Sequence, residues 1–334
     1  MIADRFGHLS NAHTPTTMKH VSTLFTLLLV TLFCSASTTP SSTCSRTDKH
    51  CEGERVWKDG TRYEGEFRYG YPHGVGTLTF ADGSTYTGNF KDGVRHGEGR
   101  YTTAGGETYE GTWLRGMKHG KGTYLWSNGS KYQGDFALDK MSGSGELVLA
   151  DGSRYTGAFR DDHADGEGTF VYKNGVTYFG NFDEGKRNGS GTVTWITGDI
   201  YSGKWDDGLL DRSGNFTFTN GDRLSCEWDQ GSLTADLTYT LDDGTVWQGS
   251  LYDLDARVQQ DEALKATSGK NVAVAWYSWA LQSVRNNRIE EARAQFAKAR
   301  ALVKPSSDLN RLIHKHLKQL DEQQQEEGLS MVMP

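Results

Sequence analysis

Three histidines recur at an interval of 23 residues, His73, His96 and His119, and each is followed by glycine. Regularly spaced imidazoles raise the question of a metal site, because histidine is a common zinc ligand. All ligands of one zinc ion must lie within about 2.3 Å of it. If 23 residues form one two-stranded hairpin, neighbouring equivalents lie about 10 Å apart. The three side chains therefore cannot share an ion, and we predict no metal site here.

No other pattern of reactive residues indicates an enzyme. Residues 120–123 (GKGT) superficially resemble a phosphate-binding loop, but they lack its long glycine-bounded spacing and the helix that follows it. His314 and His316 are two apart on a predicted helix and point to different sides. The sequence contains no nucleophile elbow and no zinc-protease motif. We therefore predict a non-enzymatic protein without a cofactor.

Two groups of side chains remain as candidate binding residues. Large aromatic rings supply rigid contact area at low entropic cost, although they are equally suited to a core. The aromatic candidates are Tyr109, Trp113, Trp126, Tyr132 and Trp195. Residues 63–131 carry a net charge of +1 and residues 132–251 a net charge of −11, so an anionic membrane would attract only the first part. The candidate lipid contacts are Arg95, Arg115, Lys118 and Lys121; the alternative is a solvated face.

An internal repeat of 23 residues must position these side chains. Each unit opens on tyrosine, with glycine two positions later and phenylalanine or tryptophan four positions later. The tyrosines are Tyr63, Tyr86, Tyr109, Tyr132, Tyr155, Tyr178 and Tyr201. Leu224 and Trp247 continue the register, which gives eight full units over residues 63–246 and a half unit at each end.

Each unit has the pattern of a β-hairpin. The Tyr-x-Gly-x-Phe/Trp segment alternates with period two, which is typical of a strand with one aromatic face. Its glycine leaves room for a neighbouring ring, and an Asn-Gly or Asp-Gly pair reverses the chain. No hairpin buries its aromatic face alone, so successive hairpins must pair. The sequence therefore predicts an all-β repeat array, an elongated antiparallel sheet of 23-residue hairpins over residues 51–252.

Residues 109–122 (YEGTWLRGMKHGKG) closely resemble the consensus of the MORN repeat (membrane occupation and recognition nexus), and residues 86–99 match as well. The resemblance implies an interaction module, a scaffold or a membrane-associating segment, which in some members is fused to a lipid kinase or a lysine methyltransferase. No segment here resembles either catalytic domain. The pattern weakens toward its end, where glycines are lost and Cys226 replaces a strand glycine. We therefore expect the last two units to be capping repeats.

The chain changes character from residue 253, where the frequent glycines end. Segments 271–285 and 289–303 resemble a single tetratricopeptide-type helical hairpin. A third helix is predicted from an N-cap at Ser306. We expect residues 253–323 to form a small α-helical cap on the last open edge of the sheet, the alternative being a partner-docking hairpin. Residues 324–334 are polar and are predicted to be disordered.

The amino-terminal residues indicate export. Residues 1–37 have the basic start, short apolar run and small residues of a secretory signal, with Met18 as a second candidate start. The alternative is an uncleaved membrane anchor. Residues 38–50 are rich in serine and threonine and predict a linker. Cys44 and Cys51 are candidates for a disulfide in an oxidising compartment; their pairing stays open at this point.

These observations favour an exported, non-enzymatic protein that acts as a protein-interaction module or scaffold in a periplasm, cell envelope or secretory lumen. The expected partner is another protein or a second copy in a homodimer. The net charge of −7 argues against nucleic acid as a partner. The alternative function is peripheral association with an anionic membrane surface through the first repeats.

Overall fold

The computed structural model describes residues 44–234 and 236–330. The predicted signal over residues 1–37, residues 38–43 of the predicted linker and residues 331–334 lie outside the described residues. The chain divides into two compact units, the first ending at Lys140 and the second beginning at Met141.

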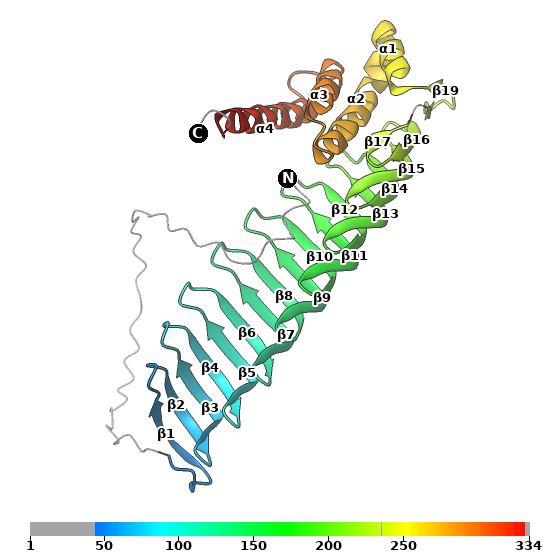
Figure 1. Cartoon of the computed structure of the whole chain (residues 1–334). Coiled ribbons are helices and arrows are strands. Elements are labelled where there is room, and N and C mark those ends of the chain that lie inside the picture. Colours follow the sequence, from blue (N-terminus) through cyan, green and yellow to red (C-terminus); the bar gives the residue numbers. More distant parts are fainter. Residues whose placement is uncertain (1–43, 235, 331–334) are drawn as a thin grey trace, which may run out of the picture. The chain divides into compact units, whose positions relative to one another are not determined.

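The first unit is built of antiparallel hairpins, and each strand pairs with the next along the chain. In Figure 1 these hairpins run from blue to cyan-green. Within each repeat a seven-residue strand carries the tyrosine and a nine-residue strand carries the Gly-x-Gly pair. The strands are β1 (Cys51–Val56), β2 (Arg62–Arg68), β3 (Tyr71–Thr79), β4 (Thr85–Lys91), β5 (Val94–Thr102), β6 (Thr108–Leu114), β7 (Met117–Leu125) and β8 (Lys131–Ala137).

The repeat glycines let the tyrosine ring lie directly over the backbone. In the third repeat Gly111 and Gly122 are partners across β6 and β7. A Cβ added to Gly122 would lie 2.5 Å from the Tyr109 ring, and one added to Gly111 would lie 2.5 Å from the Cα of Gly122. The Tyr109 hydroxyl donates a hydrogen bond of 2.9 Å to the Thr112 carbonyl oxygen. The two glycines therefore form the floor on which the ring rests.

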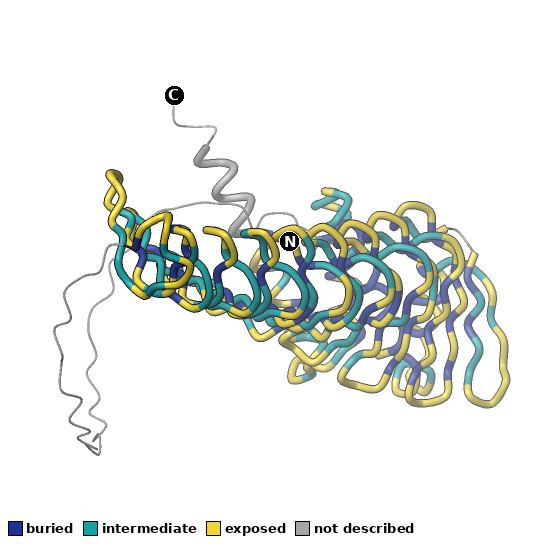
Figure 2. Tube along the Cα trace, turned by 90° about the horizontal axis from the view of Figure 1, so that it is seen from below, coloured by how far each residue is buried: buried dark blue, intermediate teal, exposed yellow. Residues whose placement is uncertain are grey.

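Aromatic rings form the core of each unit. The Tyr109 ring meets Trp113 of its own repeat at 5.1 Å and Phe136 of the next repeat at 4.9 Å, both edge to face. The same alternation continues in the second unit from Tyr155 to Trp205. Such pairs contribute about 0.5–1.5 kcal/mol each beyond area burial. Figure 2 shows the buried residues of successive hairpins in line with one another, so each hairpin is stabilised by its neighbours.

The second unit continues the hairpins and adds the helices. Its strands again pair antiparallel in chain order. They are β9 (Lys140–Val148), which holds the boundary, β10 (Arg154–Arg160), β11 (His163–Val171), β12 (Thr177–Asp183), β13 (Lys186–Thr194), β14 (Ile200–Asp206), β15 (Leu209–Thr217), β16 (Arg223–Asp229), β17 (Ser232–Leu233), β18 (Leu237–Thr240) and β19 (Val246–Gly249). The predicted all-β repeat array with a helical cap is confirmed.

The last repeat departs from the pattern where its sequence does. Without the Gly-x-Gly pair, the second strand is interrupted and forms the short β17 and β18, which both pair with β16. Cys226 takes the place of a floor glycine opposite Gly214 and is 4 % exposed. Burial raises the pKa of the Cys226 thiol to about 12, so this thiol stays protonated and unreactive at neutral pH.

Four helices follow the sheet: α1 (Leu251–Gln260), α2 (Glu262–Arg285), α3 (Ile289–Ala301) and α4 (Asp308–Ser330). α1 was not predicted, although Ser250 and Asp253 form a capping box at its start. α2 begins at Glu262, before the predicted segment 271–285, because the Asp261 carboxylate caps it. The cap of α4 is Ser307, whose Oγ accepts the Asn310 N–H at 3.1 Å, rather than the predicted Ser306.

Helix α4 also extends through residues 324–330, which we predicted to be disordered. None of the helices among the described residues is long and apolar enough to cross a membrane.

Helix α2 lies across the aromatic face of the last repeats instead of along the edge strand β19, which corrects the expected position of the cap. Near its start, Ser268 and Asn271 donate hydrogen bonds to Asp222 at 2.8 and 2.9 Å. Near its end, Gln282 accepts the Leu210 N–H at 3.2 Å, and Asn286 just beyond it donates to a neighbouring turn. Residues 268 to 286 rise about 27 Å along a helix, which matches a strand of about eight residues.

A disulfide between Cys44 and Cys51 closes the amino-terminal end of the first unit. The Asp48 carbonyl oxygen accepts the Tyr69 N–H at 2.8 Å. The Arg55 guanidinium donates to the carbonyl oxygens of Gly70 and Cys44 at 2.6 and 3.2 Å. Residues 44–50, which we predicted to be part of a linker, are therefore a cap on the first repeat.

Replacing both Cys44 and Cys51 with serine is expected to lower the free energy of unfolding by about 2 kcal/mol, because the bridge restricts the unfolded chain. Urea unfolding followed by tryptophan fluorescence measures the change. Reductant should shift the wild-type midpoint to that of the variant and leave the variant unchanged. Equal midpoints for the oxidised wild type and the variant would contradict the expected role of the bridge.

Candidate functional site

The aromatic candidates separate into core residues and accessible residues. Tyr109, Trp113 and Tyr132 are 0–2 % exposed, so they are core and not contact residues, which corrects the predicted binding strip. The Tyr109 and Trp113 rings pack against rings of adjacent repeats, an arrangement that alternation along one strand does not reveal. Trp126 and Trp195 are half-buried and reach the surface.

A second row of aromatic side chains on the same face of the first unit is accessible. Tyr124 is the cross-strand partner of the buried Tyr109, and its ring lies 4.7 Å from that of Trp126. Phe80 and Tyr101 form a similar pair at 6.0 Å. We call this surface the open aromatic face and define it by these residues and two cations: Phe80, Arg95, Tyr101, Lys118, Tyr124 and Trp126.

The two cations are built into the open aromatic face. The Arg95 guanidinium lies 4.1 Å from the centre of the Trp113 ring and donates to the Gly116 carbonyl oxygen at 2.8 Å. The Lys118 ammonium lies 4.8 Å from the centre of the Tyr124 ring. Cations over aromatic faces gain about 0.5–2 kcal/mol each. Burial lowers the pKa of Arg95, but a guanidinium keeps its charge in proteins at neutral pH.

The four predicted lipid contacts do not form one patch. Arg95 and Lys118 belong to the open aromatic face, whereas Arg115 is exposed in a hairpin turn. Lys121 forms an ion pair of 2.8 Å with Asp135. Residue 135 lies between two residues that point toward the aromatic face, so this pair lies on the opposite face.

The repeat histidines lie near the starts of β3, β5 and β7, and His73 interacts with the neighbouring turn. The Asp92 N–H donates to Nδ1 of His73 at 3.3 Å, and the Asp92 carboxylate lies 3.5 Å from the same nitrogen. Over residues 44–234 and 236–330, no group of three His, Cys, Asp or Glu side chains could hold a metal ion.

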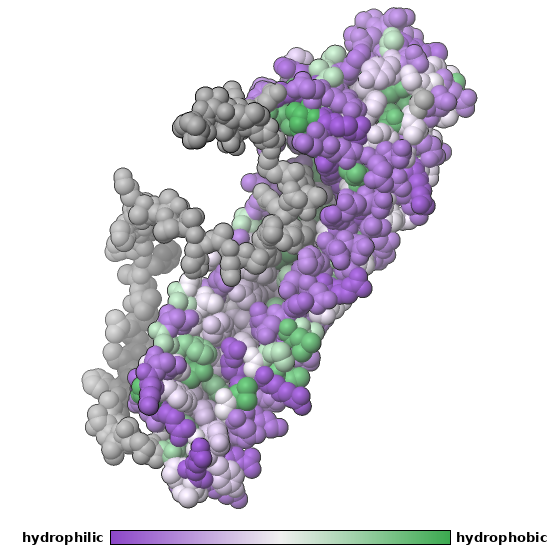
Figure 3. Space-filling view, in the orientation of Figure 1, coloured by the Kyte–Doolittle hydropathy of each residue, from purple (hydrophilic) through white to green (hydrophobic). Residues whose placement is uncertain are grey.

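The exposed side chains along one row of hairpin turns differ in chemical type between the two units. In the first unit its exposed side chains are mixed, and large apolar ones stand beside charged ones such as Lys91, Arg115 and Lys140. The apolar ones are Tyr69, Tyr71, Val94, Leu114 and Leu138. In the second unit the exposed side chains of this row are mainly acidic: Asp161, Asp162, Asp183, Glu184, Asp206, Asp207 and Asp229. Figure 3 shows the apolar patches on the first repeats in the lower half of the view. An anionic surface would therefore be repelled by the second unit.

In the other row, several neighbouring turns are joined by the side chain that follows the turn glycine. In two repeats a serine there accepts the next turn's N–H: Ser84 from Ala104 at 3.2 Å and Ser153 from Lys173 at 3.1 Å. Aspartates take this position in two later repeats. Asp199 accepts the Thr219 N–H and Asp222 accepts the Asp242 N–H, both at 3.0 Å.

The additional carboxylate oxygen of these aspartates holds α2. Asp199 pairs with Lys270 at 3.1 Å, and Asp222 accepts the Tyr239 hydroxyl at 2.5 Å besides Ser268 and Asn271. Burial alone would raise the pKa of Asp222, but the hydrogen bonds led by Tyr239 and Ser268 hold it below its usual value. Sequence analysis missed this site, although the change from serine to aspartate at one repeat position is visible in the sequence.

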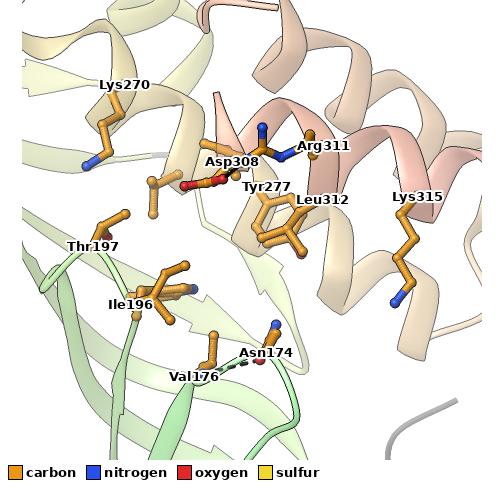
Figure 4. Close-up of a pocket in the computed structure, with 13 residues that line it drawn as sticks. Asn174, Val176, Ile196, Thr197, Lys270, Tyr277, Asp308, Arg311, Leu312 and Lys315 are labelled. Carbon is orange, nitrogen blue, oxygen red and sulfur yellow. Dashed lines mark hydrogen bonds and ion pairs between the residues drawn. The ribbon is translucent and has the colours of Figure 1, made fainter. Parts of the chain in front are cut away.

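A cavity of about 270 Å³ lies between turns of the second unit and the helices α2 and α4 (Figure 4). Val176 and Ile196 approach it from the turns, and Tyr277 and Leu312 approach it from the helices. Trp195, one of the predicted binding residues, also lines it. Lys270, Arg311 and Lys315 also line it, together with Asp308, whose carboxylate pairs with Arg311.

Comparisons with known proteins give one clear result. The family model of the MORN repeat matches seven consecutive segments, at residues 63–85, 86–108, 109–131, 132–154, 155–177, 178–200 and 201–223. It does not match the eighth predicted unit, 224–246, whose second strand is interrupted. No curated protein matches the chain.

Two solved structures are similar only at a low level. The first is the TCP domain of SAS-4 from Drosophila melanogaster in complex with a proline-rich motif of Ana2, at 11 % identity and a TM-score of 0.29, covering 60 % of this chain and 90 % of that one. The second is a streptogramin B lyase, at 11 % identity and a TM-score of 0.14, covering 59 % and 67 %. Scores of this size carry no argument about function.

Proposed function

Because the chain is a MORN-repeat protein, a member of a class of protein and membrane interaction modules, we propose that it is a non-enzymatic scaffold that binds a helical segment of a protein partner on the open aromatic face. The observation that carries the proposal is intramolecular: α2 lies on this same face of the last repeats. The repeat thus accepts a helix in one part of the chain, and its equivalent surface is accessible in another.

Aromatic side chains at equivalent repeat positions are less exposed in the second unit than in the first. Trp126 and Phe218 occupy the same place in their repeats, and Phe218 is 3 % exposed whereas Trp126 is half-buried. Tyr124 and Phe216 are related in the same way. A partner helix on the first unit would therefore bury the rings that the chain's own helix buries in the second.

The chemistry of the surface specifies the partner segment. Aromatic rings favour an apolar stripe with helical spacing, as in other helix-on-groove interactions. Arg95 and Lys118 favour acidic side chains beside that stripe, because opposite charge steers association. The partner segment is thus an acidic amphipathic helix.

Replacing Trp126 with glutamate is expected to reduce partner recovery at least tenfold, because it removes a ring and adds charge that repels an acidic helix. The measurement is quantitative pull-down with the full chain from its native compartment, followed by titration of the recovered protein. Tyr71→Glu is the matched control, since Tyr71 is an exposed ring at the start of β3 in the same unit, and this variant should keep the partner.

Four other results would overturn the proposal. Failure to recover a stoichiometric partner would remove its basis, as would equal loss in the Trp126 and Tyr71 variants. Salt-dependent sedimentation with anionic vesicles that Tyr71→Glu abolishes would favour the membrane function through the apolar turns instead. A dimer in light scattering that Trp126→Glu converts to monomer would identify the partner as a second copy.

We also propose that the protein is exported. The support is the signal-like composition of residues 1–37 together with the disulfide that closes the amino-terminal cap. Structural disulfides persist in oxidising compartments such as a periplasm or a secretory lumen.

A further inference from the structure

Two arginines of the second unit converge on one carbonyl oxygen. Arg187 of β13 and Arg285 of the last turn of α2 donate to the Gly208 carbonyl oxygen at 3.0 and 3.1 Å. Arg187 also lies 3.9 Å from the centre of the Trp205 ring. Both side chains are partly buried and keep some access to solvent. Two guanidiniums are thus held side by side at the junction of the helix and the sheet.

This pair has no acidic partner in the part of the chain that the structure describes, where Gly208 is the acceptor for both side chains. The phenol of Tyr172 lies close enough to interact electrostatically with both. Burial, followed by the charge of Arg187, lowers the pKa of Arg285 to about 9. Like charges that are brought together out of water repel each other unless an anion neutralises them.

The first unit provides an internal comparison. Arg95 stacks on Trp113 and donates to Gly116 in the way that Arg187 stacks on Trp205 and donates to Gly208. No second guanidinium joins Arg95 at Gly116 among the described residues. The repeat motif therefore explains one arginine of the pair, and Arg285 is the addition that needs a further explanation.

We propose that Arg187 and Arg285 form a binding site for a phosphate or sulfate dianion at the junction of β13 and α2. Each guanidinium has five N–H donors, and each spends one on Gly208, so donors remain for a ligand. Arginine forks match phosphate and carboxylate oxygens, and a dianion balances two positive charges where a single carboxylate balances one. The site does not depend on the open aromatic face or on the proposed function.

The test is thermal unfolding of the full chain in millimolar phosphate, sulfate or acetate, each compared with sodium chloride of equal ionic strength. Phosphate and sulfate should raise the melting temperature of the wild type by several degrees above the chloride control, and acetate should not. The variant R285Q should lose this increment. R95Q is the matched control and should keep it, because Arg95 lacks a second guanidinium.

The pH dependence separates the two anions. Inorganic phosphate loses its second charge as the pH falls from 8 to 5.5, while sulfate keeps both charges. At pH 5.5 the phosphate increment should therefore be smaller than at pH 8, and the sulfate increment should remain. If R285Q does not fold, R285K is the second variant, because lysine preserves the charge but lacks the planar fork. R285K should need at least ten times more anion for the same rise in melting temperature. The proposal would be overturned if phosphate and sulfate raised the melting temperature no more than chloride does. It would also be overturned if R285Q or R285K kept the full rise.

Discussion

The variant Gly122→Val is expected to lower the free energy of unfolding by about 4 kcal/mol. Gly122 has no left-handed backbone conformation, so the cost comes from space alone. Its added Cβ would lie 2.5 Å from the Tyr109 ring, and the ring must leave the core. Overpacking costs about 1–3 kcal/mol, and the lost edge-to-face contacts with Trp113 and Phe136 add about 0.5–1.5 kcal/mol each.

Gly105→Val is the matched control. A Cβ on Gly105 meets only the Thr103 hydroxyl at 3.8 Å, and Gly105 also lacks a left-handed conformation. Urea unfolding of both variants measures the difference. Hydrogen exchange should locate the loss of protection in β6 and β7. A Gly122 variant within 1 kcal/mol of the control would refute the role of the glycine floor.

The variant Asp222→Ala is expected to cost a similar amount, about 4 kcal/mol, and to release α2 from the sheet. It leaves the Tyr239 and Ser268 hydroxyls without their buried acceptor, and each unpaired donor costs about 1–3 kcal/mol. The Asn271 amide also loses a bond to Asp222 but keeps its bond to Asn220. Ser84→Ala is the control at the same repeat position, where one N–H bond of 3.2 Å is lost at a cost of about 1 kcal/mol.

Hydrogen exchange distinguishes release of the helix from general unfolding. In Asp222→Ala the amides of α2 should lose protection while those of β2–β7 keep it. Loss in all elements together, or in none, would contradict the anchoring role. The same carboxylate predicts an acid effect, because its pKa is lowered in the folded protein. Its stabilisation is complete above the unfolded value near 3.9 and is lost as pH falls through the lower folded value. Asp222→Asn should remove this part of the pH dependence.

The array could be predicted from sequence because the 23-residue period repeats both strand alternation and turn chemistry. The same alternation could not tell core from surface. It assigns Tyr109 and Tyr124 to one face, yet only the first is enclosed by rings from adjacent repeats. That difference arises from packing between hairpins, which a single strand does not encode.

The sequence did not lead us to the caps of α1 and α2, to the aspartates that hold α2, or to the arginine pair, and the reason differs in each case. The caps of α1 and α2, Ser250 and Asp261, are ordinary local signals that the abrupt change of composition obscured. The aspartates at 199 and 222 were visible as departures from serine in the repeat. Arg187 and Arg285 are far apart in the chain, and their meeting depends on where α2 crosses the sheet, which no local pattern specifies.

Helix α2 bonds to both rows of turns, through Asp222 at one end and Leu210 at the other. In mechanical terms, α2 is a brace that connects the two rows of turns of the last hairpins. A force that flattens these hairpins must extend the helix or break the bonds at its two ends, whereas no helix crosses the described hairpins of the first unit. Stiffness is therefore greatest where the repeat consensus is weakest, and the regular repeats are the compliant part of the chain.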